Sequence, residues 1–296
     1  SRAALYNYDV TADHVYDFTN KQATITSLVL KSSTLKLPQK IPTRRSSFLK
    51  VRVNSTLMGN IYRPFFEISD GISTEVEYFE HGAAGIRYLN ISKFVENGAT
   101  DLNINGYNVS VINGPVELIQ FDNVNLEGKR VLVLAPHPDD AEIAAFGLYS
   151  QHEDVYVVTV TSGDAGSFLY DEIYNDPIIH YLKKGEARTW NSLTVPMLGG
   201  VHPEKILNLG FNDARLKKMA TDRGYVASGL YTGVSDISTF RKQNSSSLAQ
   251  GLKGINNWDS LIENFIYLLN EIEPDVIVTP SPKLDMHSDH QYTTHA

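Results

Sequence analysis

A buried strand that ends in a cluster of ionisable groups is the feature that most constrains this chain. Residues 131–135, VLVLA, are all apolar, and His137, Asp139, Asp140 and Glu142 follow within seven positions. Ionisable groups beside a hydrophobic run must be hydrated, paired or bound to a ligand, because an isolated buried charge is very unfavourable. The function of this cluster therefore depends on what the rest of the fold brings to the end of that strand.

The sequence changes its pattern near residue 127. Residues 1–127 contain short alternating or aromatic-rich runs, such as FLKVRVN and TEVEYFE, separated by Gly, Asn, Asp and Pro. This pattern predicts an N-terminal domain of antiparallel strands, packed as a β-sandwich. From residue 128 the apolar runs do not alternate, and helical stretches separate them. This predicts an α/β domain at 128–296, with a Rossmann-like, mostly parallel sheet covered by helices on both faces.

Composition limits the classes of partner. The 296 residues are 42% hydrophobic and carry a formal net charge of -8 without a dense basic run, which argues against nucleic acid. No run of 18 apolar residues occurs, so we expect no membrane span. The chain has no cysteine, which excludes disulfides and Cys-ligated zinc. Since it begins at Ser1 without Met, we expect removal of an N-terminal piece and an exported, periplasmic or extracellular, location rather than a cytoplasmic one.

A second polar loop follows another predicted strand about 150 residues later, where PSPKLDMHSDH comes after DVIVT. If both strands lie parallel in one sheet, both loops open at the same edge, where α/β proteins bind ligands. His137 and Asp140 are three positions apart and can point the same way, and His290 can add a third ligand. Two imidazoles and a carboxylate with an open position are typical of a catalytic zinc site. We expect one Zn²⁺ per chain, with other divalent metals as alternatives.

The remaining side chains of the two loops suggest acid and base groups. Asp139 can accept a proton from water, and His287 can stabilise or protonate the species formed after attack. Taken alone, each loop has a simpler explanation, since two acids before a helix commonly act as an N-cap. Glu142 fits two roles equally, either orienting the first loop or favouring the first turn of the helix.

The motifs PHPDDAE and HSDH, together with TSGDAG after the intervening strand, resemble the signature of the PIG-L/LmbE family of zinc-dependent deacetylases. The resemblance covers about residues 128–296. It implies that His137, Asp140 and His290 are the zinc ligands and that Asp139 is the general base. It further implies that His287 is the electrophilic or acid residue and that Asp289 orients a histidine.

The same resemblance implies the reaction, removal of the acetyl group from an N-acetylated amino sugar such as N-acetylglucosamine, within a glycan. Two alternatives remain: an amidase acting on a larger sugar conjugate, and a non-catalytic glycan-binding protein with a structural metal site. A nucleotide-binding protein is disfavoured, because no Gly-rich phosphate loop follows the first strand of the second half. The oligomeric state is not predicted.

Several features depart from the family pattern. Lys183 and Glu186 stand where the resemblance suggests an Arg-x-x-Glu helix that reaches the sugar. Residues 220–254 look like an insertion at the pocket mouth, with a polar surface excursion at 240–254. Tyr225, Tyr231 and Trp258 are candidates for stacking on the faces of a sugar, although aromatic residues more often pack in a core. The chain stops six residues after His290, so we expect the domain to lack its C-terminal end. The N-terminal half has no catalytic constellation, and glycan binding or a packing role both remain open for it.

Overall fold

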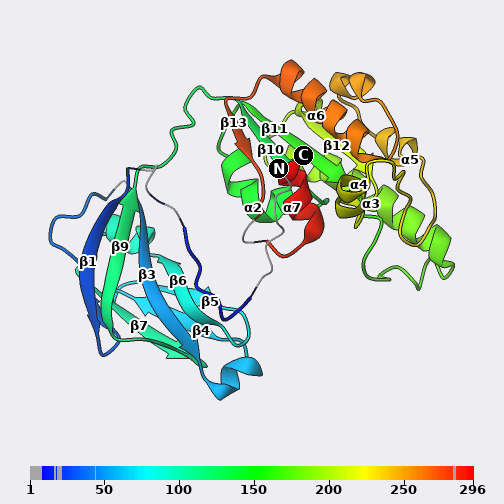
Figure 1. Cartoon of the computed structure of the whole chain (residues 1–296). Coiled ribbons are helices and arrows are strands. Elements are labelled where there is room, and N and C mark those ends of the chain that lie inside the picture. The colour runs from blue at the N-terminus through cyan, green and yellow to red at the C-terminus, as the bar shows by residue number, and fades with distance from the viewer. Residues whose placement is uncertain (1–8, 17, 19–21, 44, 283–284) are drawn as a thin grey trace. The chain divides into compact units, whose positions relative to one another are not determined.

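The chain forms two compact units in a computed structural model that describes residues 9–16, 18, 22–43, 45–282 and 285–296. Contacts divide the described chain into Asp9–Asn125, the β unit, and Leu126–Ala296, the α/β unit (Figure 1). Lys283 and Leu284 of the second polar loop lie outside the described residues, as does the start of the predicted N-terminal domain. No helix in the described part of the chain combines the length and the hydrophobicity of a membrane span.

The β unit is built from antiparallel strands, as the alternating pattern predicted. Its elements are β1 (Thr24–Lys31), β2 (Thr34–Lys36), β3 (Ser46–Ser55), a 3-10 turn (Leu57–Asn60), β4 (Phe65–Ser69), β5 (Thr74–Tyr78), β6 (Ala84–Asn90), α1 (Ser92–Glu96), β7 (Asp101–Tyr107), β8 (Val109–Val111) and β9 (Gly114–Phe121).

These strands form one hydrogen-bonded path in the order β5-β4-β7-β2-β1-β9-β3-β6, with β8 paired to β3. Alternate side chains of β3, β4 and β6 are buried, which is the pattern of strands with one face inward. Inward residues from both halves of the path, such as Leu49, Phe66 and Leu102, share one core. The sheet therefore folds over on itself, and its two end strands, β5 and β6, come close together (Figure 1).

The α/β unit alternates strands with helices. Its elements are β10 (Val131–Ala135), α2 (Asp140–Tyr149), β11 (Val155–Thr161), α3 (Pro177–Leu198), a 3-10 turn (Pro203–Lys205), β12 (Ile206–Phe211), α4 (Leu216–Thr221), α5 (Ser238–Arg241), a second 3-10 turn (Ser247–Gly251), α6 (Trp258–Ile272), β13 (Val276–Val278) and α7 (Ser288–His295).

The four strands of this unit are all parallel, in the order β12-β11-β10-β13. β10 pairs directly with β13, so the two strands that precede the polar loops are neighbours, as expected. From β10 the chain steps outward through β11 and β12, then returns to place β13 on the other side of β10. Such a reversal opens a crevice at the carboxyl ends of the strands, where ligands bind in open α/β sheets.

Helices cover both faces of the parallel sheet and create two separate cores. One core packs residues of α2 and α3 against β10 and β11, and the other packs α4 and α6 against β11 and β12. α6 shows why these helices form where they do. Its first turn is capped by the Asn257 side chain, which accepts from the Ser260 N–H, and it ends at Glu273, directly before Pro274.

The polar segment at 240–254 lies at the surface, as its composition predicted, and it also covers an edge strand. Phe240 is buried in this segment. The Asn244 side chain accepts from the Asn208 N–H of β12 and donates to the Asn208 carbonyl. The polar residues of the segment therefore satisfy backbone groups that the last strand of a sheet leaves unpaired.

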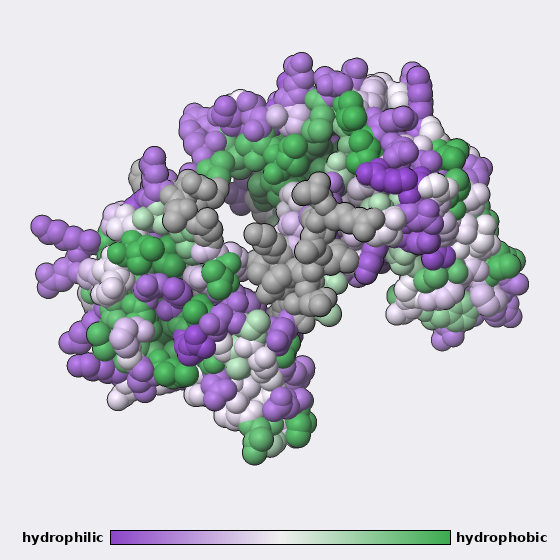
Figure 2. All heavy atoms as spheres, viewed as in Figure 1, coloured by the Kyte–Doolittle hydropathy of each residue, from purple (hydrophilic) through white to green (hydrophobic). Residues whose placement is uncertain are grey.

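The opposite edge of the sheet carries a hydrophobic area, visible over β13 and α6 in Figure 2. A hollow of about 290 Å³ lies there, lined by Leu132, Phe265, Leu268 and Ile277 among others. The lining also includes Thr279, which follows β13, and Thr293 and Thr294 of α7.

Candidate metal centre

Side chains from three strand ends meet at the carboxyl edge of the parallel sheet. His137 and Asp140 follow β10, Asp213 follows β12, and His287 and His290 follow β13. They converge because parallel strands end at the same edge. The loop after β11 supports them through Asp164, a fully buried carboxylate that accepts from the Asp213 N–H.

The three predicted metal ligands present their donor atoms to one point. His137 Nδ1 lies 3.1 Å from His290 Nε2 and 3.2 Å from Asp140 Oδ2, and the last two atoms are 3.3 Å apart. Bonds of about 2.0–2.2 Å from a tetrahedral zinc to nitrogen and oxygen would separate its ligand atoms by roughly 3.3–3.5 Å. The triangle thus has the size that a metal ion requires.

A second group of potential ligands lies on the other side of His137. His137 Nε2 is 3.1 Å from Asp213 Oδ1 and 3.3 Å from Asp289 Oδ2. Asp289 is fully buried, and its carboxylate also accepts from the N–H groups of Ala214 and Leu216. These backbone bonds fix the carboxylate against the His137 ring and hold it in one orientation.

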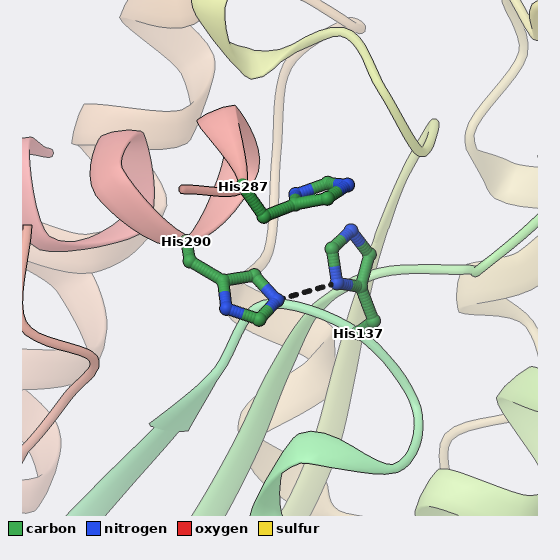
Figure 3. Close-up of side chains that lie close together, drawn as sticks. All are labelled: His137, His287 and His290. Atoms are coloured by element: carbon green, nitrogen blue, oxygen red, sulfur yellow. Dashed lines mark hydrogen bonds between the residues drawn. The ribbon is translucent and has the colours of Figure 1, made fainter. Parts of the chain in front are cut away.

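The two remaining rings are also held in place (Figure 3). His290 Nδ1 lies 2.5 Å from Asp285 Oδ2, which leaves Nε2 directed at the triangle. His287 caps α7, since its Nδ1 accepts from the Asp289 N–H. The proton of a neutral His287 ring must then lie on Nε2. The His287 ring meets the His137 ring edge to face at 4.7 Å, so its ring nitrogens lie near those of His137 and His290.

The electrostatics of the cluster favour a cation. Burial opposes the charged form of His137, but the hydrogen bonds that its ring donates to Asp140, Asp213 and Asp289 raise its pKa to about 12. Burial likewise opposes the charged form of Asp140, but its contacts with His137 and His290 lower its pKa. Several carboxylates thus surround two imidazoles, and the site holds positive charge strongly.

Asp139 has a different partner from the members of these clusters, although it is adjacent in sequence to Asp140. It stands at the N-cap position of α2, yet its side chain makes no capping hydrogen bond. Instead its Oδ1 accepts from a guanidinium nitrogen of Arg188, at 2.9 Å, and the same nitrogen donates to the Pro138 carbonyl. Arg188 passes close over Gly163, where a Cβ atom would lie 2.4 Å from its Nε.

Three acidic or basic residues of the site, Asp213, Asp285 and Arg188, were not identified from the sequence. Asp213 follows a buried strand, so the rule that found His137 applies to it as well. Asp285 lies within the second polar loop without a distinguishing spacing. Arg188 lies in the middle of α3 and reaches the site only through the packing of that helix.

The expected departures on α3 and the candidate aromatics have other roles in the structure. Lys183 and Glu186 form an ion pair at 2.7 Å on α3. Trp258, a candidate for stacking on a sugar, is the first residue of α6, and its side chain is buried in the core. Burial of so large an aromatic ring stabilises the core. Tyr231 stacks on Tyr181, with ring centroids 4.1 Å apart. Glu142 is half-buried, and burial raises its pKa.

The solved structures that match this chain do so with low TM-scores and low sequence identity. A xylanase mutant from Cellvibrio japonicus in complex with xylopentaose is 8% identical, with 85% of this chain and 59% of that chain covered and a TM-score of 0.19. A glycosylation-associated protein complex from Streptococcus agalactiae is 12% identical, with 98% of both chains covered and a TM-score of 0.15. The chain thus spans less than two thirds of the length of the xylanase. No curated protein sequence matches it.

A protein-family model gives a clear result. The model described as PIG-L, GlcNAc-PI de-N-acetylase, matches residues 132–296, which is more than half of the chain and includes every residue of the candidate metal centre. The resemblance of PHPDDAE and HSDH to that family is therefore confirmed, and this chain belongs to the PIG-L family.

Proposed function

We propose that this protein is a zinc-dependent deacetylase that hydrolyses the acetamide of an N-acetylated amino sugar within a glycan. Family membership supports a deacetylase acting on N-acetylglucosamine-like substrates. The observation that carries the metal dependence is the triangle of donor atoms from His137, Asp140 and His290, with sides of 3.1–3.3 Å.

In this proposal the triangle holds one Zn²⁺, with other divalent metals as alternatives. Asp285 and Asp289 orient the two imidazoles from behind, as carboxylates do for histidine ligands of metals. When bound, the metal supplies Lewis acidity toward a carbonyl group and water. The second group, His137 with Asp213 and Asp289, is a rival site on the opposite nitrogen of the same ring.

The chain's own acid and base groups flank this site. Asp139 is the proposed general base, since Arg188 fixes one carboxylate oxygen and no other contact occupies the second among the described residues. Asp139 takes a proton from the attacking water and later passes it toward the leaving amine. His287 carries its proton on Nε2, where it can donate to the oxyanion that forms at the former carbonyl.

The fold and domain assignments belong to the same proposal. We infer that the α/β unit is Rossmann-like because the strand order reverses at β10, and that the β unit is a β-sandwich because its sheet folds over one core. We place the domain boundary after residue 127, within the mostly exposed stretch 122–129. The exported location stays a prediction.

A screen for acetate release across N-acetylated sugars and larger sugar conjugates, with and without a chelator, tests the proposal. Chelator-sensitive release from an N-acetylated amino sugar supports a deacetylase. Cleavage of only the larger conjugates would favour an amidase. Sugar binding that survives chelation, without turnover of any compound, would favour a glycan-binding protein.

A further inference from the structure

A cavity of about 680 Å³ lies within the β unit, where the two end strands of the folded sheet approach each other. Glu77 and Tyr78, at the end of β5, line one side, and Arg87 and Tyr88, on β6, line another. Its volume is that of small-molecule sites, which are typically about 300–1,000 Å³ and combine aromatic walls with a few polar groups.

The polar groups of this cavity are incompletely satisfied. Glu77 is half-buried, and in the described part of the chain no hydrogen bond or ion pair reaches its carboxylate. Burial correspondingly raises its pKa. Arg87 is only 4% exposed, its terminal nitrogens donate to the carbonyls of Val10, Ala12 and Ile86, and its Nε lies 3.7 Å from Glu80. The Glu77 carboxylate is therefore a group of this cavity that lacks a partner among the described residues, and such half-buried polar groups are normally paired with water or with a ligand.

Aromatic rings extend the site beyond the cavity. Tyr78 is 53% exposed, and the Arg63 guanidinium lies over its ring at 4.8 Å. Tyr16 and Tyr88 meet edge to face at 4.6 Å, and both also line a second hollow of about 300 Å³, whose walls are aromatic. The two hollows share these rings, so an extended molecule can lie across both.

The chemistry of the cavity fits a hydroxylated ligand. A hydroxyl group both donates and accepts hydrogen bonds, so it can satisfy carboxylates and guanidinium groups in one place. Glu77 and Glu80 are acceptors only, and Arg63 and Arg87 are donors only. Exposed aromatic rings offer flat apolar surfaces against which the C–H faces of a sugar ring can pack. A polyanion would meet the two glutamates, which disfavours nucleic acid.

We propose that this cleft of the β unit, formed by Arg63, Glu77, Tyr78, Glu80, Arg87 and Tyr88, binds an oligosaccharide independently of the metal centre. The choice of N-acetylglucosamine oligomers as its ligand rests on the proposed function, because the α/β unit would act on such a glycan. The cleft then holds a polymer whose acetamide groups are the substrate, which raises the local concentration of substrate at the enzyme.

The test measures binding of the N-acetylglucosamine hexamer to the full chain by calorimetry, in a His290→Ala background so that turnover does not interfere. Tyr78→Ala is expected to weaken binding about tenfold, because it removes the exposed ring, whereas Tyr78→Phe keeps the ring and stays within about threefold. Tyr62→Ala is the matched control, since Tyr62 is exposed in the same unit and lines neither hollow.

Equal binding by Tyr78→Ala and Tyr62→Ala would overturn the proposal, as would an absence of hexamer binding to the His290→Ala parent at millimolar concentrations. Thermal unfolding of each variant checks that the fold is intact. Failure of the proposed function looks different, because the wild type would then release no acetate while hexamer binding still depended on Tyr78.

Discussion

His290 Nδ1 lies 2.5 Å from Asp285 Oδ2, and this contact turns the Nε2 atom of the same ring toward His137 and Asp140. The carboxylate fixes both the tautomer and the orientation of the imidazole, as partners behind metal-binding histidines do. Asp285 therefore determines whether His290 can complete the triangle, although it contributes no atom to it.

Replacing Asp285 by Ala should weaken zinc binding about ten- to a hundredfold, because the His290 ring then loses its partner. Asp285→Asn retains an oxygen acceptor and should lose less. Competition with a chelator of known affinity measures the effect. Asp259→Asn is the control, since it removes an exposed acid far from the site in sequence. Equal zinc affinity in Asp285→Ala and the control would contradict the orienting role.

Replacing Asp139 by Asn separates metal binding from catalysis. The amide keeps the size of the side chain and can still accept from Arg188, but it cannot take a proton at neutral pH. We expect turnover to fall about a hundred- to ten-thousand-fold while zinc stays bound. Mass spectrometry for metal and an assay for acetate give the two readings. Near-normal turnover would shift the base assignment to His287, and loss of zinc would exchange the roles of Asp139 and Asp140.

Arg188 is expected to act through Asp139. Arg188→Lys removes the planar guanidinium, one terminal nitrogen of which bonds both Asp139 and the Pro138 carbonyl, and replaces it with a flexible ammonium group, so kcat should fall about ten- to a hundredfold without loss of metal. Gly163→Ala should have a similar effect, because its Cβ would displace Arg188 and its φ of 67° disfavours alanine. Asn191→Ala is the control, since Asn191 is exposed on the same helix. If that variant lost as much activity as Arg188→Lys, the effect would belong to the helix rather than to the contact.

The metal-free chain should lose stability as the pH rises. The pKa of His137 is raised to about 12 from an unfolded value of about 6.5. The folded state therefore binds the extra proton, and this contribution is fully present below pH 6.5 and is lost as the pH rises toward 12. We expect the Tm of the metal-free chain to fall between pH 6.5 and 9, and to fall less in His137→Gln. Parallel slopes for the two proteins would show that His137 does not hold this proton.

The sequence predicted the parts of the site that depend on local pattern. His137 and Asp140 lie at the end of an apolar run, and His290 lies after another, so parallel pairing of β10 with β13 was sufficient to bring them together. Arg188 could not be found this way, because a charged residue within a helix resembles an ordinary surface residue until the helix is packed. The ligand and catalytic roles themselves remain predictions.

The sequence likewise predicted the types of strand in the fold but not how the strands are ordered. Alternation in the first half indicated antiparallel strands, but not their order, because β1 pairs with β9 and these strands lie nearly 90 positions apart. Such long-range pairings depend on the packing of the whole sheet rather than on local pattern. The sequence placed the segment at 240–254 at the surface, but it could not show that the Asn244 side chain bonds to the backbone of β12.

The most direct test of the central claim is the rate of acetate release as zinc is titrated into the metal-free chain, with an N-acetylglucosamine oligomer as substrate. The account predicts no release without metal, a linear rise up to one zinc per chain, and a plateau beyond it, with one new amine formed for each acetate. Release that does not depend on zinc, or no release from any acetylated amino sugar at one zinc per chain, would contradict it.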